Sequence, residues 1–209
     1  MLNFLARDSI SKSIAPLGRR LAATGITPNV ITVIGTVGSI AGAVVFFTQG
    51  WWFAGTLIVW AFVMADLLDG AVARAGGTTS AFGGVLDSTC DRAVDAAVFG
   101  SILWFYAEHG QRWMVLAALL CLVLGSLTSY IRSRAEAAGM HATVGIAERA
   151  ERLIIVLVGT GLTGDPFGLP FVQAVALWVL VAASAITVGQ RLATVHQQSK
   201  AREREAAGT

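Results

Sequence analysis

The chain has 209 residues, of which 55% are hydrophobic and 13% are charged, with a formal net charge of +2 and a mean hydropathy of +0.68. Soluble domains average about 25% charged residues, so the composition excludes an ordinary soluble protein and predicts an integral membrane protein. We expect the lipid bilayer, and no nucleic acid, among its partners. Cys90 and Cys121 form no CxxC pair and no spaced framework, so neither a disulfide scaffold nor a zinc site is predicted.

The first segment, residues 1–24, is predicted to be an amphipathic helix that lies on the membrane surface. Its apolar residues recur near helical spacing from Leu2 to Leu21, which is typical of such a helix. Charged residues such as Arg7 and Lys12 interrupt the continuous apolar core that a signal peptide requires. A short disordered tail is the alternative for this segment.

Six apolar stretches then follow, and we predict an all-α integral membrane protein in which each forms a transmembrane helix. They cover residues 28–48, 51–73, 83–106, 113–133, 149–162 and 171–192. The first of them contains the spacing Gly38-x3-Gly42, which permits close approach of another helix. We expect this approach to occur within the bundle rather than between subunits.

An even number of spans places both termini on one side of the membrane, and charge identifies that side. Of the fifteen basic residues, only Arg112 falls at the opposite ends of the spans. The positive-inside rule therefore predicts that the termini face the cytoplasm. We expect the protein to lie in the cell membrane. Residues 195–209 are predicted to be a charged C-terminal tail, and its last ten residues, 200–209, are predicted to be mobile. No repeat or second domain is evident, so we expect one domain over residues 1–209.

An acidic motif joins the second and third predicted spans. It reads Asp66-x2-Asp69-Gly70-x2-Ala73-Arg74-x8-Gly83-x3-Asp87-x3-Asp91. Carboxylates are costly to place in a membrane and usually mark function there. The intervening segment, residues 75–82, suits a short turn between antiparallel helices, which places the active region at the cytoplasmic ends of both spans.

The spacing of the motif predicts a metal site. Asp66 and Asp69 are three residues apart on one helix, and Asp87 and Asp91 are four apart on the next, so each pair shares a helix face. Four converging carboxylates could not all stay ionised alone. Two divalent cations would neutralise them, and all-oxygen ligands favour Mg²⁺, or Mn²⁺. Such an arrangement suits phosphoryl chemistry.

Two other interpretations of the acidic motif remain open at this point. The acids could pair with Arg74 and Arg92 as buried salt bridges, although two arginines cannot balance five aspartates once Asp95 is included. A divalent-cation transporter could also use such a cluster, but it would not require Gly70 or Arg74. Asp95 either supports the carboxylates that bind the metal or pairs with a base from another span, and both alternatives stay open.

The motif resembles that of the CDP-alcohol phosphotransferases, D-x2-D-G-x2-A-R-x8-G-x3-D-x3-D, at all eight fixed positions. This resemblance implies a membrane enzyme with six transmembrane helices, normally a homodimer. It implies that Asp66, Asp69, Asp87 and Asp91 bind two divalent metals and that Asp91 is also the general base. The implied reaction transfers a phosphatidyl group from a CDP-linked donor to an alcohol and releases CMP.

The same resemblance assigns a pocket for the nucleotide end of CDP-diacylglycerol. The segment from Thr27 to Thr32 resembles the one that opens the first span in that family. Helix capping explains Thr27 and Pro28 without a ligand, but it does not require Asn29 or Thr32. The residues that the resemblance implies for donor binding are Asn29, Val30, Ile31, Thr32, Gly70, Arg74 and Ser80.

A second basic cluster bears on the acceptor. Arg132 and Arg134 end the fourth span, Arg149 and Arg152 begin the fifth, and Arg191 ends the sixth. A phosphorylated acceptor needs such arginines, whereas positive-inside flanking alone would also place them here.

Stretches around the motif, around Arg132 and around Arg152 look like those of actinobacterial phosphatidylinositol-phosphate synthases. That likeness implies inositol phosphate as the acceptor, with its phosphate bound by Arg132, Arg134, Arg152 and Arg191. Phosphatidylglycerophosphate synthase, which uses glycerol 3-phosphate, is the nearest rival.

Overall fold

The structure is a computed structural model that describes residues 27–76 and 80–207, with the backbone alone for residues 65–76 and 206–207. All regular structure in these ranges is helical, which confirms the predicted all-α class. The amphipathic helix predicted over residues 1–24 lies outside the described residues. The chain divides into two compact units, each described below by itself: residues 1–47 with 54–98, and residues 48–53 with 99–209.

The first unit is built from α2, α3 and the beginning of α4. Helix α2 (Pro28–Gly42) continues into a short π-helical turn, η1 (Ala43–Phe47), and is followed by α3 (Trp52–Gly76) and α4 (Ala81–Glu108). A Cβ on Gly38 would lie 2.4 Å from the Phe62 ring, and one on Gly42 would lie 2.7 Å from Ile58. These two glycines therefore let α2 pack closely on α3, as predicted for packing within the bundle.

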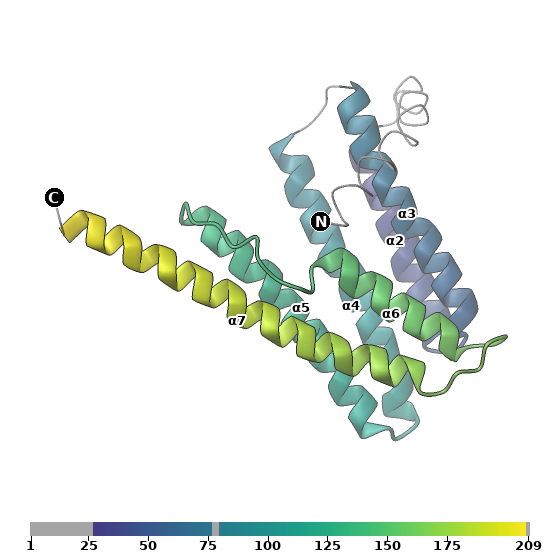
Figure 1. Cartoon of the computed structure of the whole chain (residues 1–209). Helices are drawn as coiled ribbons and strands as arrows, with labels where there is room; N and C mark the ends of the chain where they lie inside the picture. The colour runs from purple at the N-terminus through teal and green to yellow at the C-terminus, as the bar shows by residue number, and fades with distance from the viewer. Residues whose placement is uncertain (1–26, 77–79, 208–209) are drawn as a thin grey trace. The chain divides into compact units, whose positions relative to one another are not determined.

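The second unit contains the rest of α4 with α5 (Arg112–Ala137), α6 (Arg149–Thr163) and α7 (Val172–Ala207). Helix α7 packs against both α5 and α6, as Figure 1 shows. Its 36 residues correspond to about 54 Å at 1.5 Å per residue. We predicted from the sequence that the last span ends near residue 192 and that a charged tail follows it. The helix instead continues to Ala207.

Three helical segments in the described part of the chain are long and apolar enough to cross a membrane: Pro28–Phe47, Arg112–Ala137 and Val172–Glu205. Trp52–Met64 is a shorter apolar helix. Every predicted span coincides with a helix, but α4 carries Asp87 and Asp91 in its first half and Asp95 at its middle, which makes it less apolar. The described structure thus supports a helical membrane protein, and the count of six crossings remains a prediction.

Candidate functional site

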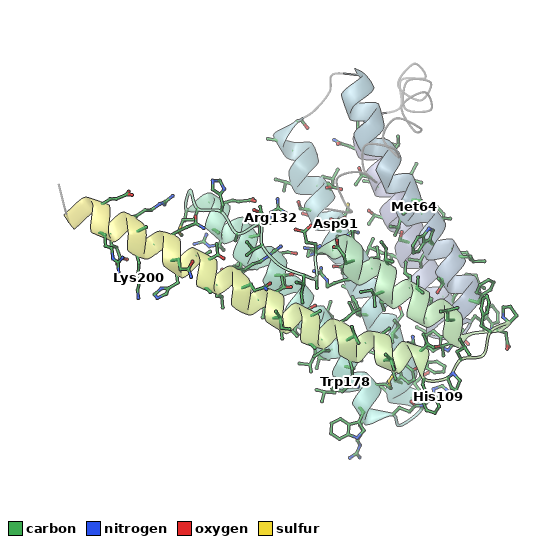
Figure 2. All side chains as sticks on the ribbon, viewed as in Figure 1. Met64, Asp91, His109, Arg132, Trp178 and Lys200 are labelled. Carbon is green, nitrogen blue, oxygen red and sulfur yellow. The ribbon has the colours of Figure 1, made fainter. Side chains whose placement is uncertain are left out.

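The acidic motif lies on α3 and α4, as its spacing predicted. Asp66 and Asp69 fall on α3, where the structure describes the backbone alone. Asp87 and Asp91 lie one turn apart on α4, and both are half-buried; Asp91 is labelled in Figure 2. Within the side chains that the structure describes, no three His, Cys, Asp or Glu residues are close enough to hold a metal ion. The convergence of all four carboxylates therefore remains a prediction.

Asp95 continues the same face of α4 one turn further and is only 6% exposed. Its Oδ2 atom lies 3.4 Å from Nη2 of Arg92, three residues earlier on the same helix. Arg92, on the same helix, is thus one base that pairs with Asp95, and pairing with a base from another span remains a prediction. This pairing leaves Asp87 and Asp91 as the more accessible carboxylates of α4. Their hard oxygen donors fit a divalent cation.

The start of α4 lies beside the start of α2 within the first unit. Gly83 donates its backbone N–H to Ser80 Oγ over 3.0 Å, so Ser80 caps the first turn of α4. A Cβ on Gly83 would lie 3.1 Å from Ser80 Oγ and 3.4 Å from Asn29 Oδ1. The structure therefore brings together two of the predicted nucleotide-binding side chains, Asn29 and Ser80, at the glycine of the motif.

Some of the other residues at the start of α2 stabilise the helix rather than line a ligand site. Thr27 has extended backbone angles and Pro28 takes the first helical position, although the Thr27 side chain makes no capping hydrogen bond. Thr32 is buried and donates its hydroxyl to the Pro28 carbonyl over 3.1 Å. Val30 is exposed and Ile31 is half-buried. Capping accounts for Pro28, but it gives no role to Asn29.

The arginines of the second unit divide into an exposed pair and a buried pair. Arg134 is exposed, and Arg132, labelled in Figure 2, is exposed and forms a salt bridge with Glu136, its Nε lying 2.9 Å from Oε1. Arg152 and Arg191, by contrast, are only 2% and 4% exposed. Positive-inside flanking does not require burial, so the two buried arginines call for another explanation.

Both buried arginines bind the same residue of α5, Thr128, which sequence reasoning missed. Arg152 donates from Nη1 to Thr128 Oγ1 over 3.1 Å and to the Ala147 carbonyl over 3.3 Å. Arg191 donates from Nη1 to the Thr128 carbonyl over 2.5 Å and from Nε to the Val144 carbonyl over 2.9 Å. The charge of Arg152 repels that of Arg191, and Glu148 attracts it; a further anion beside the two guanidinium groups would be favoured.

The loop between α5 and α6, residues 138–148, is fastened to one face of α7. Thr187 Oγ1 accepts hydrogen bonds from the backbone N–H groups of Ile146 and Ala147, over 3.2 and 3.1 Å. Gln198 binds both the N–H and the carbonyl of His141. Arg202 donates to the carbonyls of Ala138 and Gly139. The charged end of α7 is thus part of the fold of this unit.

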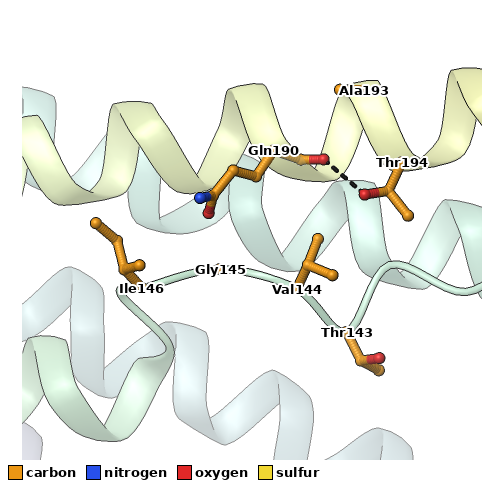
Figure 3. Close-up of a pocket in the computed structure, with 7 residues that line it drawn as sticks. All are labelled: Thr143, Val144, Gly145, Ile146, Gln190, Ala193 and Thr194. Carbon is orange, nitrogen blue, oxygen red and sulfur yellow. Dashed lines mark hydrogen bonds between the residues drawn. The ribbon is translucent and has the colours of Figure 1, made fainter.

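A shallow pocket of about 610 Å³ lies between this loop and α7. Figure 3 shows its lining, in which the Thr194 hydroxyl donates to the Gln190 carbonyl over 2.9 Å. The lining residues are Thr143, Val144, Gly145, Ile146, Gln190, Ala193 and Thr194. None of them is ionisable, so the pocket itself offers no group for acid–base catalysis or ion pairing.

Comparison with known proteins places these features in a family context. A family model described as CDP-alcohol phosphatidyltransferase matches residues 25–189. The phosphatidylinositol phosphate synthase of Mycobacterium marinum is 49% identical over 194 residues, which cover 92% of this chain and 83% of that protein.

Two crystal structures of the Mycobacterium tuberculosis phosphatidylinositol phosphate synthase are also similar. The one with CDP-DAG bound has a TM-score of 0.83 at 49% identity and covers 87% of this chain and 92% of its own. The one in complex with manganese and citrate has a TM-score of 0.82 at 48% identity and covers 87% and 88%.

Proposed function

This chain belongs to the CDP-alcohol phosphatidyltransferase family, and from that premise we propose that it transfers the phosphatidyl group of CDP-diacylglycerol to inositol phosphate. The products are phosphatidylinositol phosphate and CMP. The relatives at 48–49% identity are phosphatidylinositol phosphate synthases. Membership of this family makes the chain an enzyme of phospholipid synthesis and displaces the transporter interpretation of its acidic residues.

The observation that favours a phosphorylated acceptor over a neutral alcohol is the burial of Arg152 and Arg191 around Thr128. A neutral alcohol would add no negative charge beside the two buried guanidinium groups, whereas a phosphate monoester would add about two. We assign the acceptor phosphate to these two residues, with the exposed Arg132 and Arg134 as further ligands. Glycerol 3-phosphate carries the same phosphate, so the arginines alone do not separate the two acceptors, and the choice of inositol phosphate follows the relatives.

Asp66, Asp69, Asp87 and Asp91 would hold the metal, which we propose to be two Mg²⁺ ions, with Mn²⁺ as a possible substitute. Hard carboxylate oxygens in the α3–α4 motif suit either ion, and a relative binds manganese. When bound, the ions supply positive charge that stabilises the attacking and the leaving oxygen. Asn29, Val30, Ile31, Thr32, Gly70, Arg74 and Ser80 would bind the donor, and the approach of Asn29 and Ser80 at Gly83 supports this assignment.

Asp91 is our proposed general base. Its carboxylate takes the proton of an inositol hydroxyl, and that oxygen forms a bond to the phosphorus that carries diacylglycerol. The bond between this phosphorus and the CMP oxygen breaks, and CMP leaves with the electron pair. Arg152 and Arg191 hold the acceptor phosphate, so that the hydroxyl is presented in one orientation.

We further propose that residues 1–209 form one domain with six membrane crossings in the cell membrane, as a homodimer, with the termini and the active site facing the cytoplasm. The family match over residues 25–189 supports one domain, and the distribution of the basic residues supports the orientation. Modification of single cysteines placed at the loop ends, from either side of a sealed vesicle, tests the orientation.

The reaction is tested with purified protein, CDP-diacylglycerol and Mg²⁺, offering inositol phosphate, free inositol or glycerol 3-phosphate in separate reactions while CMP release is measured. We expect release with inositol phosphate alone. Release with glycerol 3-phosphate alone would replace the proposed acceptor and leave the transfer chemistry intact. Asp91→Asn should abolish turnover while CDP-diacylglycerol still binds, and retained turnover would contradict its assignment as the base.

A further inference from the structure

Thr128 occupies a special place among the buried polar residues of the second unit. It is 1% exposed, and its two oxygens receive hydrogen bonds from two different helices. Its hydroxyl oxygen accepts from Arg152 of α6, and its backbone carbonyl accepts from Arg191 of α7. Thr128 thus accepts one N–H group from each of the two buried guanidinium groups and restrains the orientation of both.

The hydroxyl of Thr128 is itself held in one orientation. It donates to the Gly125 carbonyl over 2.8 Å, one turn back on α5. Because its hydrogen is committed to that carbonyl, its lone pairs are directed away from α5, where Arg152 Nη1 lies. The helix backbone therefore orients the hydroxyl, and the hydroxyl orients the arginine.

Gly125 provides the space for this arrangement. A Cβ at this position would lie 3.2 Å from Arg152 Nε and 3.4 Å from both Cζ and Nη2. The distance to Nε is tighter than ordinary van der Waals contact, so a methyl group would displace the guanidinium by a few tenths of an ångström. Gly125 thus leaves room on α5 for the Arg152 guanidinium that Thr128 binds.

We propose that Thr128, assisted by the space at Gly125, is a positioning residue for the acceptor phosphate in the phosphatidyl transfer reaction. It holds the Arg152 guanidinium at a fixed tilt beside Arg191, so that both point their remaining N–H groups at one phosphate monoester. Bidentate binding of a phosphate by arginine depends on the orientation of the guanidinium plane. A guanidinium that can rotate freely loses this bidentate geometry. This inference rests on the proposed function.

The test compares Thr128→Val with Thr128→Ser in the full-length protein. Valine keeps the shape and removes the hydroxyl acceptor, whereas serine keeps that acceptor. We expect Thr128→Val to raise the KM for inositol phosphate about tenfold, the equivalent of one lost hydrogen bond to a charged group. The KM for CDP-diacylglycerol should stay unchanged, and Thr128→Ser should restore the acceptor KM to within about twofold.

Thr160→Val is the matched control. Thr160 is a fully buried threonine on α6 that accepts a hydrogen bond from Gln173 over 3.0 Å. It lies eight residues beyond Arg152, about 12 Å along the helix. Its loss should lower thermal stability and leave the acceptor KM unchanged. Equal acceptor KM values for Thr128→Val and Thr160→Val would overturn the inference.

Gly125→Ala provides a second test, which keeps the Thr128 hydroxyl and crowds Arg152 instead. It should also raise the KM for inositol phosphate without changing the KM for CDP-diacylglycerol. An unchanged acceptor KM would show that the space at Gly125 does not position Arg152.

Arg152→Ala and Arg191→Ala separate this inference from its premise. If neither arginine variant affects the acceptor KM, the proposed acceptor site itself is wrong. If both raise it and Thr128→Val does not, the positioning role alone fails.

Discussion

The second unit contains two buried polar networks on neighbouring helices, and they differ in charge. The neutral network consists of Tyr106, Gln173 and Thr160: the Tyr106 hydroxyl donates to Gln173 Oε1, and Gln173 Nε2 donates to Thr160 Oγ1 over 3.0 Å. The arginine network consists of Thr128, Arg152 and Arg191, with the hydrogen bonds described above. Each joins three helices through buried side chains.

The difference between the networks shows how a stabilising cluster is told from a binding site. In the neutral network each side-chain oxygen and nitrogen has a hydrogen-bond partner within the network, so the network stabilises the fold without a ligand. In the arginine network, two positive charges donate to the oxygens of Thr128, Val144 and Ala147, and Glu148 is the acid whose charge attracts Arg191 most strongly. Dipoles compensate buried charges only in part. An anionic ligand would complete the second network and would add nothing to the first.

The largest expected effect follows from removing a buried charge of the arginine network. Arg191→Ala should lower kcat/KM for inositol phosphate at least about 30-fold, because a buried charged hydrogen-bonding group contributes roughly 2–5 kcal/mol to binding its partner. The KM for CDP-diacylglycerol should remain within about twofold of the wild-type value. Steady-state CMP release with each substrate varied in turn measures both. A loss that falls equally on the two substrates would make Arg191 a structural residue.

The reciprocal change tests the neutral network. Gln173→Leu removes the partner of both Tyr106 and Thr160, which leaves buried polar groups unsatisfied at a cost of about 1–3 kcal/mol. A chain of this size should then lose about 2–12 °C in Tm, measured in detergent micelles. The KM for inositol phosphate should not change. A raised KM for inositol phosphate with an unchanged Tm would show that the neutral network also contributes to acceptor binding and does not stabilise the fold.

The positions of the helices could be predicted from the sequence, whereas the division among the arginines could not. Long apolar stretches define a membrane helix locally, so the expected span 28–48 matches Pro28–Phe47 closely. Burial of Arg152 depends instead on Thr128, 24 residues away, and Arg191 binds a carbonyl 63 residues away. In the sequence, an arginine at the end of a span has the same pattern whether its side chain is exposed or buried. The sequence therefore predicted the same role for all four arginines.

The end of α7 was mispredicted for a related reason. Its charged residues are typical of a solvated tail, yet Gln198 and Arg202 bind the backbone of the α5–α6 loop. These contacts join residues 57 and 64 positions apart and leave no local pattern. The acidic motif shows the opposite case, because its i, i+3 and i, i+4 spacings already determine which carboxylates share a helix face.

The exposed arginines should contribute less than the buried pair. Arg134→Gln is expected to raise the KM for inositol phosphate only about threefold at low salt, and still less at about 0.5 M salt, because the field of an exposed charge is screened. Arg132 is held by Glu136 through a salt bridge on the same helix, so Glu136→Gln should lower this KM slightly. Acceptor KM values measured across a salt series check both. A salt-independent loss as large as that of Arg191→Ala would remove the distinction between the two pairs.

The smallest effect is expected at the far end of α7, where Arg202 donates to the carbonyls of Ala138 and Gly139. Arg202→Ala should loosen the beginning of the α5–α6 loop, and amide hydrogen exchange there should speed up. The acceptor KM should rise less than about twofold, because Thr187 and Arg191 still fasten the end of the loop that precedes Arg152. Lys200→Ala is the matched control, since Lys200 is an exposed cation two residues away on the same helix. Equal exchange rates in the two variants would show that the charged end of α7 contributes nothing to the loop. A large rise in the acceptor KM for Arg202→Ala alone would instead extend the acceptor site along α7, beyond the arginine network.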